Sequence, residues 1–275
     1  MNVLLASDGS WHALQAARFL GRLLPQSGSI RIDLTTVLST DPALDRGSFH
    51  RSLKEGKKWW AENEAWLEVA EAALHGPSVR VKRQTLTGGA AEALVRNSSA
   101  YDLVVAGVKG ESAEEFVQLG IVARALLRHA ESSVLLVRDR LADAGAAAFG
   151  DLGRPPLVIL PSDGSARGLE AAWTQLDSLS IRCGAPEILM VRNAGCGVCQ
   201  RAGETGADLI VLGASGTGPS GPAPLETVDR EVAWRAPCSV LMLRRPEKAA
   251  TTGTKDVAAR RGTQKYVATE SSSAA

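Results

Sequence analysis

The segment LVVAGVKG (residues 103–110) decides the fold of this chain, together with Gly120 and the segment SVLLVR (residues 133–138) that follow it. A continuous apolar run that ends in glycine is typical of a parallel strand covered on both faces. We therefore predict a buried strand, a glycine loop, a helix and a second buried strand. Ligands of open α/β sheets bind at the carboxyl ends of the strands, where this loop would lie.

The same signature occurs a second time in the chain. The segments DLIVLGASG (residues 208–216) and SVLMLR (residues 239–244) repeat the strand, the loop and the last strand at an offset of 106 residues. The opening of the chain recurs at residues 157–165, at an offset of 155. The two offsets, 155 and 106, differ by 49 residues, about one strand and one long helix. We therefore predict a duplication with five strands in the first sheet and about four in the second.

The composition fits soluble domains and excludes several classes of function. The 275 residues suffice for about two domains, each with its own core. A formal net charge of +1 gives no electrostatic reason to bind nucleic acid or an anionic membrane. No apolar run approaches the roughly 18 residues that span a bilayer, and the N-terminus lacks the basic region of a signal peptide. We expect a cytoplasmic protein with neither a nucleic-acid nor a membrane partner.

The apolar periodicity ahead of the glycine loop predicts alternating strands and helices. The expected strands are residues 3–6, 30–38 and 79–86, and the expected helices are residues 13–24, 48–74 and 90–97. In the second helix, leucine and tryptophan recur every seven residues on one face. We interpret this stripe as a surface that packs on the sheet, with a partner-binding surface as the alternative.

Changes in composition predict the domain boundaries. We expect a first domain at residues 1–138 and a linker rich in alanine, glycine and charge at 139–154. A shortened second domain should occupy residues 155–245. Residues 246–275 carry few large apolar side chains, so we expect a disordered tail there.

Three glycines and one aspartate form the candidate binding site. Gly107, Gly110 and Gly120 would let a ligand approach the backbone closely, and successive backbone N–H groups can bind an anion. Asp8 ends the first strand, where a carboxylate can accept hydrogen bonds from ribose hydroxyls or hold a cation. This set suits a nucleotide. The alternative is that the glycines merely shape a strand-to-helix turn.

These features, in this order and twice in one chain, resemble the universal stress protein family. Its members pair an opening strand that ends in Asp-Gly-Ser with a loop of pattern Gly-x-x-Gly, nine residues, then Gly-Ser/Thr. The resemblance covers about residues 1–138 and, in shortened form, 155–245. It implies two flavodoxin-like or Rossmann-like α/β domains with parallel sheets, of strand order 3-2-1-4-5 in the first. It also implies pairing of two copies through their last strands, within the chain or in a homodimer.

The resemblance further implies the residues of an adenine-nucleotide site, with ATP, ADP or AMP as candidate ligands and no cofactor required. Carried over by position, these residues are Asp8, Val37 through its backbone, Gly107, Gly110, Gly120, Ile121 and Val122. Ile121 stands where the family has a phosphate-contacting hydroxyl. The loop also carries Glu111, Glu114 and Glu115, which would repel a triphosphate. Adenine or AMP is therefore favoured over ATP.

The second copy of the site is degenerate. Asp163 and Thr227 remain, but Glu226 replaces the third glycine. Residues 216–221 match the pattern G-x-G-x-x-G, but two nearby prolines leave few of the N–H donors that a pyrophosphate needs. We interpret the second half as a structural partner of the first.

Cysteine provides the main alternative chemistry. Cys196 and Cys199 form a Cys-x-x-Cys pair that follows a strand and opens a helix, which is the layout of a redox dithiol. With Cys183 and Cys238 the pair could instead hold zinc, although buried or idle thiols are the favoured interpretation. The histidines are dispersed, no catalytic motif is present and no metal site is predicted.

The sequence thus predicts a non-enzymatic stress-response or regulatory module with weak adenine-nucleotide binding in its first half. Two alternatives remain open. One is a thiol-redox or zinc-holding module that uses Cys196 and Cys199, and the other is a protein-interaction scaffold without a ligand.

Overall fold

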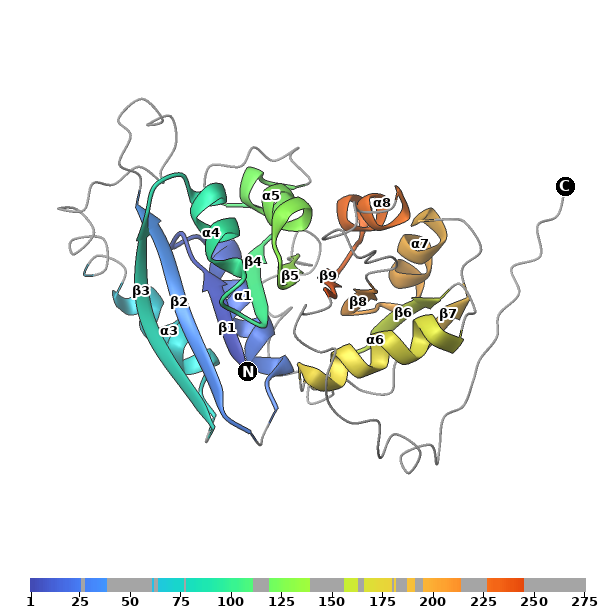
Figure 1. The fold of residues 1–275 in the computed structure, drawn as a ribbon, viewed down its shortest axis with the longest axis horizontal. Helices are drawn as coiled ribbons and strands as arrows, with labels where there is room; N and C mark the ends of the chain where they lie inside the picture. The colour runs from blue at the N-terminus through green and yellow to red at the C-terminus, as the bar shows by residue number, and fades with distance from the viewer. Residues whose placement is uncertain are drawn as a thin grey trace, which may run out of the picture.

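A single nine-stranded sheet runs through both halves of the chain, in the order β3-β2-β1-β4-β5-β9-β8-β6-β7 (Figure 1). The computed structural model describes residues 1–25, 28–38, 61, 64–76, 78–110, 119–138, 156–162, 166–179, 181, 187–190, 195–213 and 227–244. The expected linker at 139–154 and the expected tail at 246–275 lie outside these residues.

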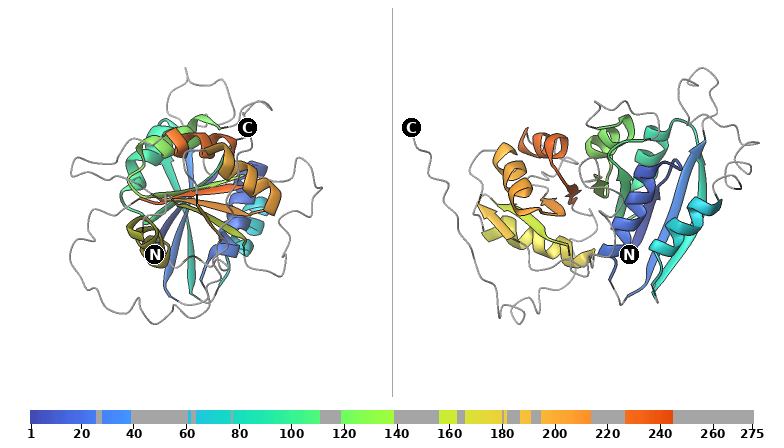
Figure 2. Two further views of the ribbon diagram at one scale, coloured as in Figure 1. Left: turned by 90° about the vertical axis from the view of Figure 1, so that its right-hand side faces the viewer. Right: turned by 180° about the vertical axis from the view of Figure 1, so that it is seen from behind.

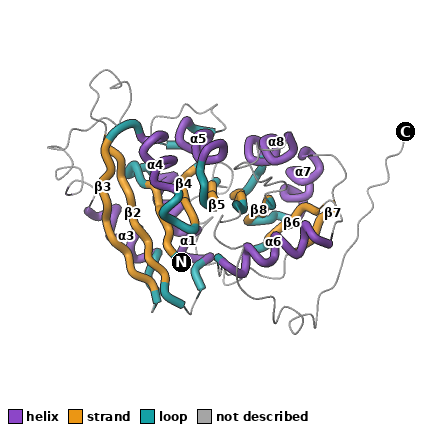
Figure 3. Tube along the Cα trace, in the orientation of Figure 1, coloured by secondary structure: helices purple, strands orange, loops and turns teal. Residues whose placement is uncertain are grey.

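Strands and helices alternate in each half (Figure 3). The strands are β1 Asn2–Ala6, β2 Ile30–Leu38, β3 Val79–Thr87, β4 Leu103–Gly107, β5 Ser133–Val137, β6 Val158–Ser162, β7 Glu187–Met190, β8 Leu209–Leu212 and β9 Ser239–Met242. The helices are α1 Trp11–Leu23, α3 Glu64–Ala73, α4 Ala90–Ser98, α5 Ile121–His129, α6 Ala166–Ser178, α7 Gly195–Thr205 and α8 Thr227–Arg235.

The central strands are buried on both faces because helices cover both sides of the sheet (Figure 2). In β4, Leu103 and Val105 face one core, while Val104 and Ala106 face the other. The first core includes side chains of α1, α3 and α6, and the second includes side chains of α4, α5, α7 and α8. This double coverage explains why β4 and β5 are apolar at successive positions rather than at alternate ones.

The two halves meet through their last strands. Strand β5 pairs with β9 in the antiparallel direction, with Leu135 opposite Leu241, whereas every other neighbouring pair in the sheet is parallel. The strand order 3-2-1-4-5 in the first half and the four strands of the second half are therefore confirmed. The pairing that the resemblance implied is made within the chain.

Equivalent hydrogen bonds in the two halves support the duplication. In the first half, Asp102 precedes β4 and its Oδ2 accepts the backbone N–H of Asn2, with an N–O distance of 2.6 Å. In the second half, Asp208 precedes β8 and its Oδ2 accepts the backbone N–H of Leu157 at 2.8 Å. In both places an aspartate ties the start of one strand to the start of its neighbour.

Helix α3 lies within the helix expected at residues 48–74, of which residues 48–60, 62 and 63 lie outside the described residues, and it packs closely on α1. A Cβ atom at Gly21 would lie 1.9 Å from the carbonyl oxygen of Ala73 in α3, so the two backbones touch at this point. The equivalent position in the second half, at the offset of 155, is Leu176, which is buried. The second copy lacks the stretch that contains α3, and it has a buried leucine where α1 has a glycine.

The leucine and tryptophan stripe belongs to the core wherever the structure describes it. Leu67 and Leu74 are fully buried, and Trp66 packs against the same core. The remaining members of the stripe lie outside the described residues. Strand β3 is an edge strand, and partly buried and exposed residues alternate along most of it. Among the described residues, no helix combines the length and the apolar composition needed to cross a membrane.

Candidate functional site

The candidate site lies at the carboxyl ends of β1, β2 and β4, where the strand order reverses. Strand β1 lies between β2 and β4, so the chain leaves β1 and β4 in opposite directions across the sheet. Helix α1 follows β1 on one face, and α5 follows β4 on the other. A reversal of this kind creates the crevice in which open α/β sheets bind ligands.

Asp8 lies in the turn that leads from β1 into α1. Its Oδ1 accepts the backbone N–H of Ser10 at 2.9 Å, and Gly9 adopts a positive φ of 78°, which glycine tolerates. Ser10 in turn caps α1, because its Oγ accepts the backbone N–H of Ala13 at 3.2 Å. The turn therefore holds the Asp8 carboxylate at the carboxyl end of β1.

Val37 directs its backbone groups, not its side chain, toward the carboxyl end of β1. Its side chain is 4% exposed and packs in the core. Two residues earlier, the carbonyl of Thr35 accepts the N–H of Ser7, just past the end of β1. Backbone groups two residues apart along a strand point to the same side, so the N–H and C=O of Val37 point to the space beyond β1.

Gly107 is small because α1 leaves no room for a side chain. A Cβ atom there would lie 3.1 Å from the Cβ of His12 and 3.0 Å from the carbonyl oxygen of Lys109. Its φ does not lie in the left-handed region that favours glycine, so the close packing against α1 accounts for the lack of a side chain at residue 107. His12 is a neighbour of the site that the sequence pattern did not reveal.

Gly110 and Gly120 lie close to each other. The N–H of Gly120 donates to the carbonyl of Val108 at 2.8 Å, and a Cβ at Gly120 would lie 3.9 Å from the nitrogen of Gly110. Residues 111–118, which include the three glutamates of the loop, lie outside the described residues.

Helix α5 begins directly after Gly120, without a side-chain cap. Its N-cap residue is Gly120, which has no side chain, whereas α1 is capped by Ser10. The first N–H groups of a helix carry a partial positive charge and bind anions. Ile121 stands next to them with 72% of its surface exposed, and Val122 packs on the core. The arrangement can accept an anionic group, but it offers no hydroxyl at residue 121.

The sequence-predicted residues that the structure describes therefore lie along the carboxyl ends of three neighbouring strands. These residues are Asp8, Val37, Gly107, Gly110, Gly120, Ile121 and Val122. In the second half, Thr227 begins α8, and Asp163, Glu226 and residues 216–221 lie outside the described residues.

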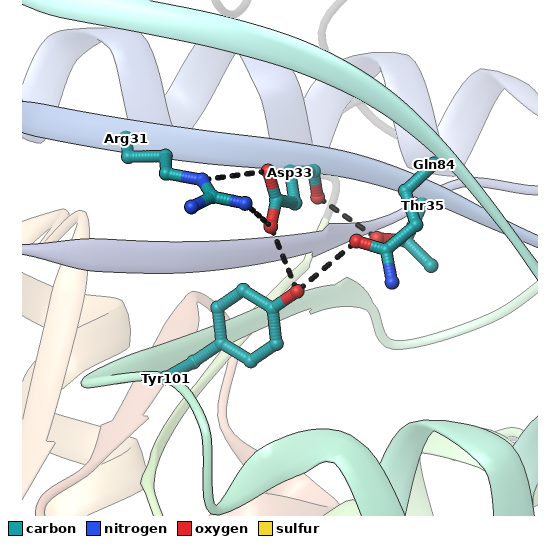
Figure 4. A network of polar contacts seen from close by, with 5 residues as sticks. All are labelled: Arg31, Asp33, Thr35, Gln84 and Tyr101. Carbon is teal, nitrogen blue, oxygen red and sulfur yellow. Dashed lines mark hydrogen bonds and ion pairs between the residues drawn. The ribbon is translucent and has the colours of Figure 1, made fainter.

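A separate polar network lies along β2, away from these strand ends (Figure 4). Asp33 is 2% exposed, and its carboxylate accepts two hydrogen bonds from the Arg31 guanidinium at 3.2 and 3.1 Å. The Tyr101 hydroxyl donates to Asp33 Oδ2 at 2.9 Å and lies 3.2 Å from Gln84 Oε1. Burial, with the hydrogen bond to Asp33 as a second cause, raises the pKa of Tyr101 to about 12. These contacts satisfy a buried carboxylate, so we assign the network a structural role.

The cysteines do not form a metal site within the described part of the chain. Cys199 is partly buried and Cys238 is fully buried. The Cys183 and Cys196 side chains lie outside the described residues. No group of three or more histidine, cysteine, aspartate or glutamate side chains comes together as metal ligands among the residues that are described.

Comparison with known proteins connects this architecture to a family. The family model described as "Universal stress protein family" matches residues 1–138 and 185–244. No curated protein matches the chain. Among solved structures, a universal stress protein from Archaeoglobus fulgidus is 18% identical with a TM-score of 0.59, and the match covers 89% of this chain and 98% of that one.

Two further structures share the fold along most of their length. A functionally unknown protein from Pseudomonas aeruginosa PAO1 is 14% identical with a TM-score of 0.53, and the match covers 89% of this chain and 92% of that one. A putative universal stress protein from another strain of the same species is 15% identical with a TM-score of 0.53, covering 89% and 93%. Since the family model matches most of both halves, this chain belongs to the universal stress protein family.

Proposed function

We propose that this chain is a non-enzymatic regulatory module of the stress response that binds an adenine nucleotide in its first half. The observation that supports the proposal is that three groups follow or lie near the carboxyl ends of the neighbouring strands β2, β1 and β4. They are the Asp8 carboxylate, the outward-facing backbone of Val37 and the N-terminus of α5, which has no side-chain cap.

Each group suits a different part of the ligand. An adenine edge carries both a hydrogen-bond donor and an acceptor, which one exposed backbone N–H and C=O can match. A carboxylate at the end of the first strand suits ribose hydroxyls, and a helix N-terminus suits a phosphate. Ile121 is exposed and has no hydroxyl for a further phosphate. We therefore expect AMP to bind more tightly than ATP.

Binding would act by changing the population of loop conformations. A ligand that bridges Asp8 and the N-terminus of α5 favours the arrangement in which both lie at the crevice. A partner that recognises this arrangement would then bind more tightly. The role needs no bond to be made or broken, so we propose no catalytic residue.

Nucleotide binding can be tested by thermal unfolding. We measure the Tm with AMP, ADP and ATP, each with and without magnesium, and we expect AMP to raise it most. A ligand at 100 times its Kd stabilises the folded state by about 2.7 kcal/mol, so at equal concentrations the nucleotide with the lowest Kd gives the largest shift. Asp8→Asn should reduce this shift, and Asp163→Asn, the equivalent change in the degenerate copy, should leave it unchanged. If none of the nucleotides moves the Tm of the wild-type chain, the nucleotide role is wrong and a scaffold without a ligand is favoured.

A further inference from the structure

The two last strands end in arginines that cross the boundary between the halves. Arg138 follows β5 and Arg244 follows β9, at the repeat offset of 106 residues. The backbone N–H of Arg244 donates to Ser133 Oγ at 3.1 Å, and that of Arg138 donates to Ser239 Oγ at 3.3 Å. Each arginine is therefore anchored to the first residue of the strand opposite.

The Arg244 side chain completes the C-terminus of α5. Its Nη2 donates to the carbonyl of Leu127, and the residue is 7% exposed. In a continued helix this carbonyl would accept the N–H of Glu131, but that N–H donates to Ser98 Oγ at 3.0 Å. Arg244 thus supplies from the second half a hydrogen bond that the helix cannot make itself. A cation at this end is also favoured by the helix dipole.

Arg138 makes the equivalent contact in the other direction. Its Nη2 donates to the carbonyls of Ala233 at 3.1 Å and Trp234 at 3.3 Å, in the last turn of α8. Residue 237, which would serve the Ala233 carbonyl in a continued helix, is a proline without an N–H. Burial lowers the pKa of Arg138. The last helix of each half is therefore completed by the other half.

Helix α5 connects this boundary to the candidate binding site. It spans nine residues, Ile121–His129, so roughly 13 Å separates its ends. Arg244 holds the C-terminal end, and the N-cap residue Gly120 forms the N-terminal end. That residue is bonded to Val108, whose own N–H donates to the carbonyl of Val137 at 3.0 Å, beside Arg138. Gly120 is thus tied to the boundary through the helix and through β5.

We propose that Arg244 is a positioning residue for the first half's binding site, through which the degenerate second half sets the orientation of α5 and its N-terminal N–H groups. The expected consequence is that the nucleotide affinity of the first half depends on a residue of the second half. This consequence rests on the proposed function. It assigns the second half a role beyond covering the edge of β5.

Two variants of the full chain test the inference. Arg244→Gln removes the contact to α5, and Arg138→Gln removes the matched contact to α8, while both keep the backbone bond to serine. By hydrogen exchange, we expect amides of residues 120–129 to exchange at least about 10-fold faster in R244Q, with α8 little changed, and the reverse in R138Q. With AMP as the probe, R244Q should raise the Kd about 5- to 10-fold and R138Q less than about 2-fold.

A conservative variant separates positioning from general stability. Arg244→Lys keeps a donor for the Leu127 carbonyl, so it should restore most of the AMP affinity and of the exchange protection. The inference is wrong if α5 exchanges at the wild-type rate in R244Q, or if R138Q weakens AMP binding equally. If the wild-type chain bound no nucleotide, the proposed function would fail, and the exchange rates would still decide whether Arg244 holds α5.

Discussion

Asp33 shows at the scale of one residue how a charge is accommodated inside the sheet. A buried carboxylate is costly unless hydrogen bonds replace the water that it loses. Arg31 lies two residues away on the same face of β2, and Tyr101 reaches the carboxylate from 68 residues further along the chain. The local spacing indicates the first contact, but nothing local indicates the second.

Removing the Tyr101 hydroxyl should destabilise the protein. Tyr101→Phe takes one donor from the buried Asp33 carboxylate, and we expect a loss of about 1–2 kcal/mol in unfolding free energy. Urea titration at neutral pH measures it. Arg96→Gln serves as a control, because the Arg96–Glu92 ion pair is exposed and should contribute little. An unchanged midpoint in Tyr101→Phe would show that the hydroxyl does not stabilise Asp33.

Because of Tyr101, the free energy of unfolding should depend on pH in the alkaline range. Its pKa rises from 10.0 to about 12 on folding, so the neutral phenol is favoured in the folded state. This contribution is fully present below pH 10 and is lost as the pH rises towards 12. Between these values the wild type should lose more stability than Tyr101→Phe in denaturant titrations. Parallel losses would contradict the raised pKa.

At the scale of elements, the close contact between α1 and α3 depends on Gly21. Gly21→Ala would place a Cβ 1.9 Å from the Ala73 carbonyl oxygen, so the helices must separate, and we expect a loss of about 1–3 kcal/mol. Gly203→Ala in α7 is the matched control. Its Cβ would meet nothing within 4 Å, so it should stabilise the protein by about 0.5–1 kcal/mol. Thermal unfolding of both variants checks the prediction, and equal shifts would contradict it.

The element boundaries follow the local chemistry closely. Ser10 caps α1 and the helix begins at Trp11, two residues before the apolar periodicity suggested. Strand β4 ends at Gly107, where His12 and Lys109 leave no room for a side chain. The glycine could be located from the sequence. The contact between His12 and Gly107 could not, because it joins elements that are distant in the chain.

At the scale of the molecule, the continuous sheet should make the halves unfold together. One core includes Val3 and Leu135 from the first half and Leu209 and Leu241 from the second. We expect a single denaturant transition, with coincident fluorescence and circular dichroism curves. Leu241→Ala, a fully buried position opposite Leu135, should lower the stability by about 2–5 kcal/mol without splitting this transition. Two separate transitions in the wild type would contradict a shared core.

The sequence by itself determined the strands, the duplication, the missing strand of the second half and the residues at the strand ends. These features depend on apolar runs and glycines, which act over a few neighbouring residues. Tertiary structure alone decided that the last strands β5 and β9 pair within one chain, that Asp33 is satisfied by Tyr101, and that each half completes the other's last helix. Such contacts join groups up to 117 residues apart, and no local pattern encodes which distant donor will reach a given acceptor.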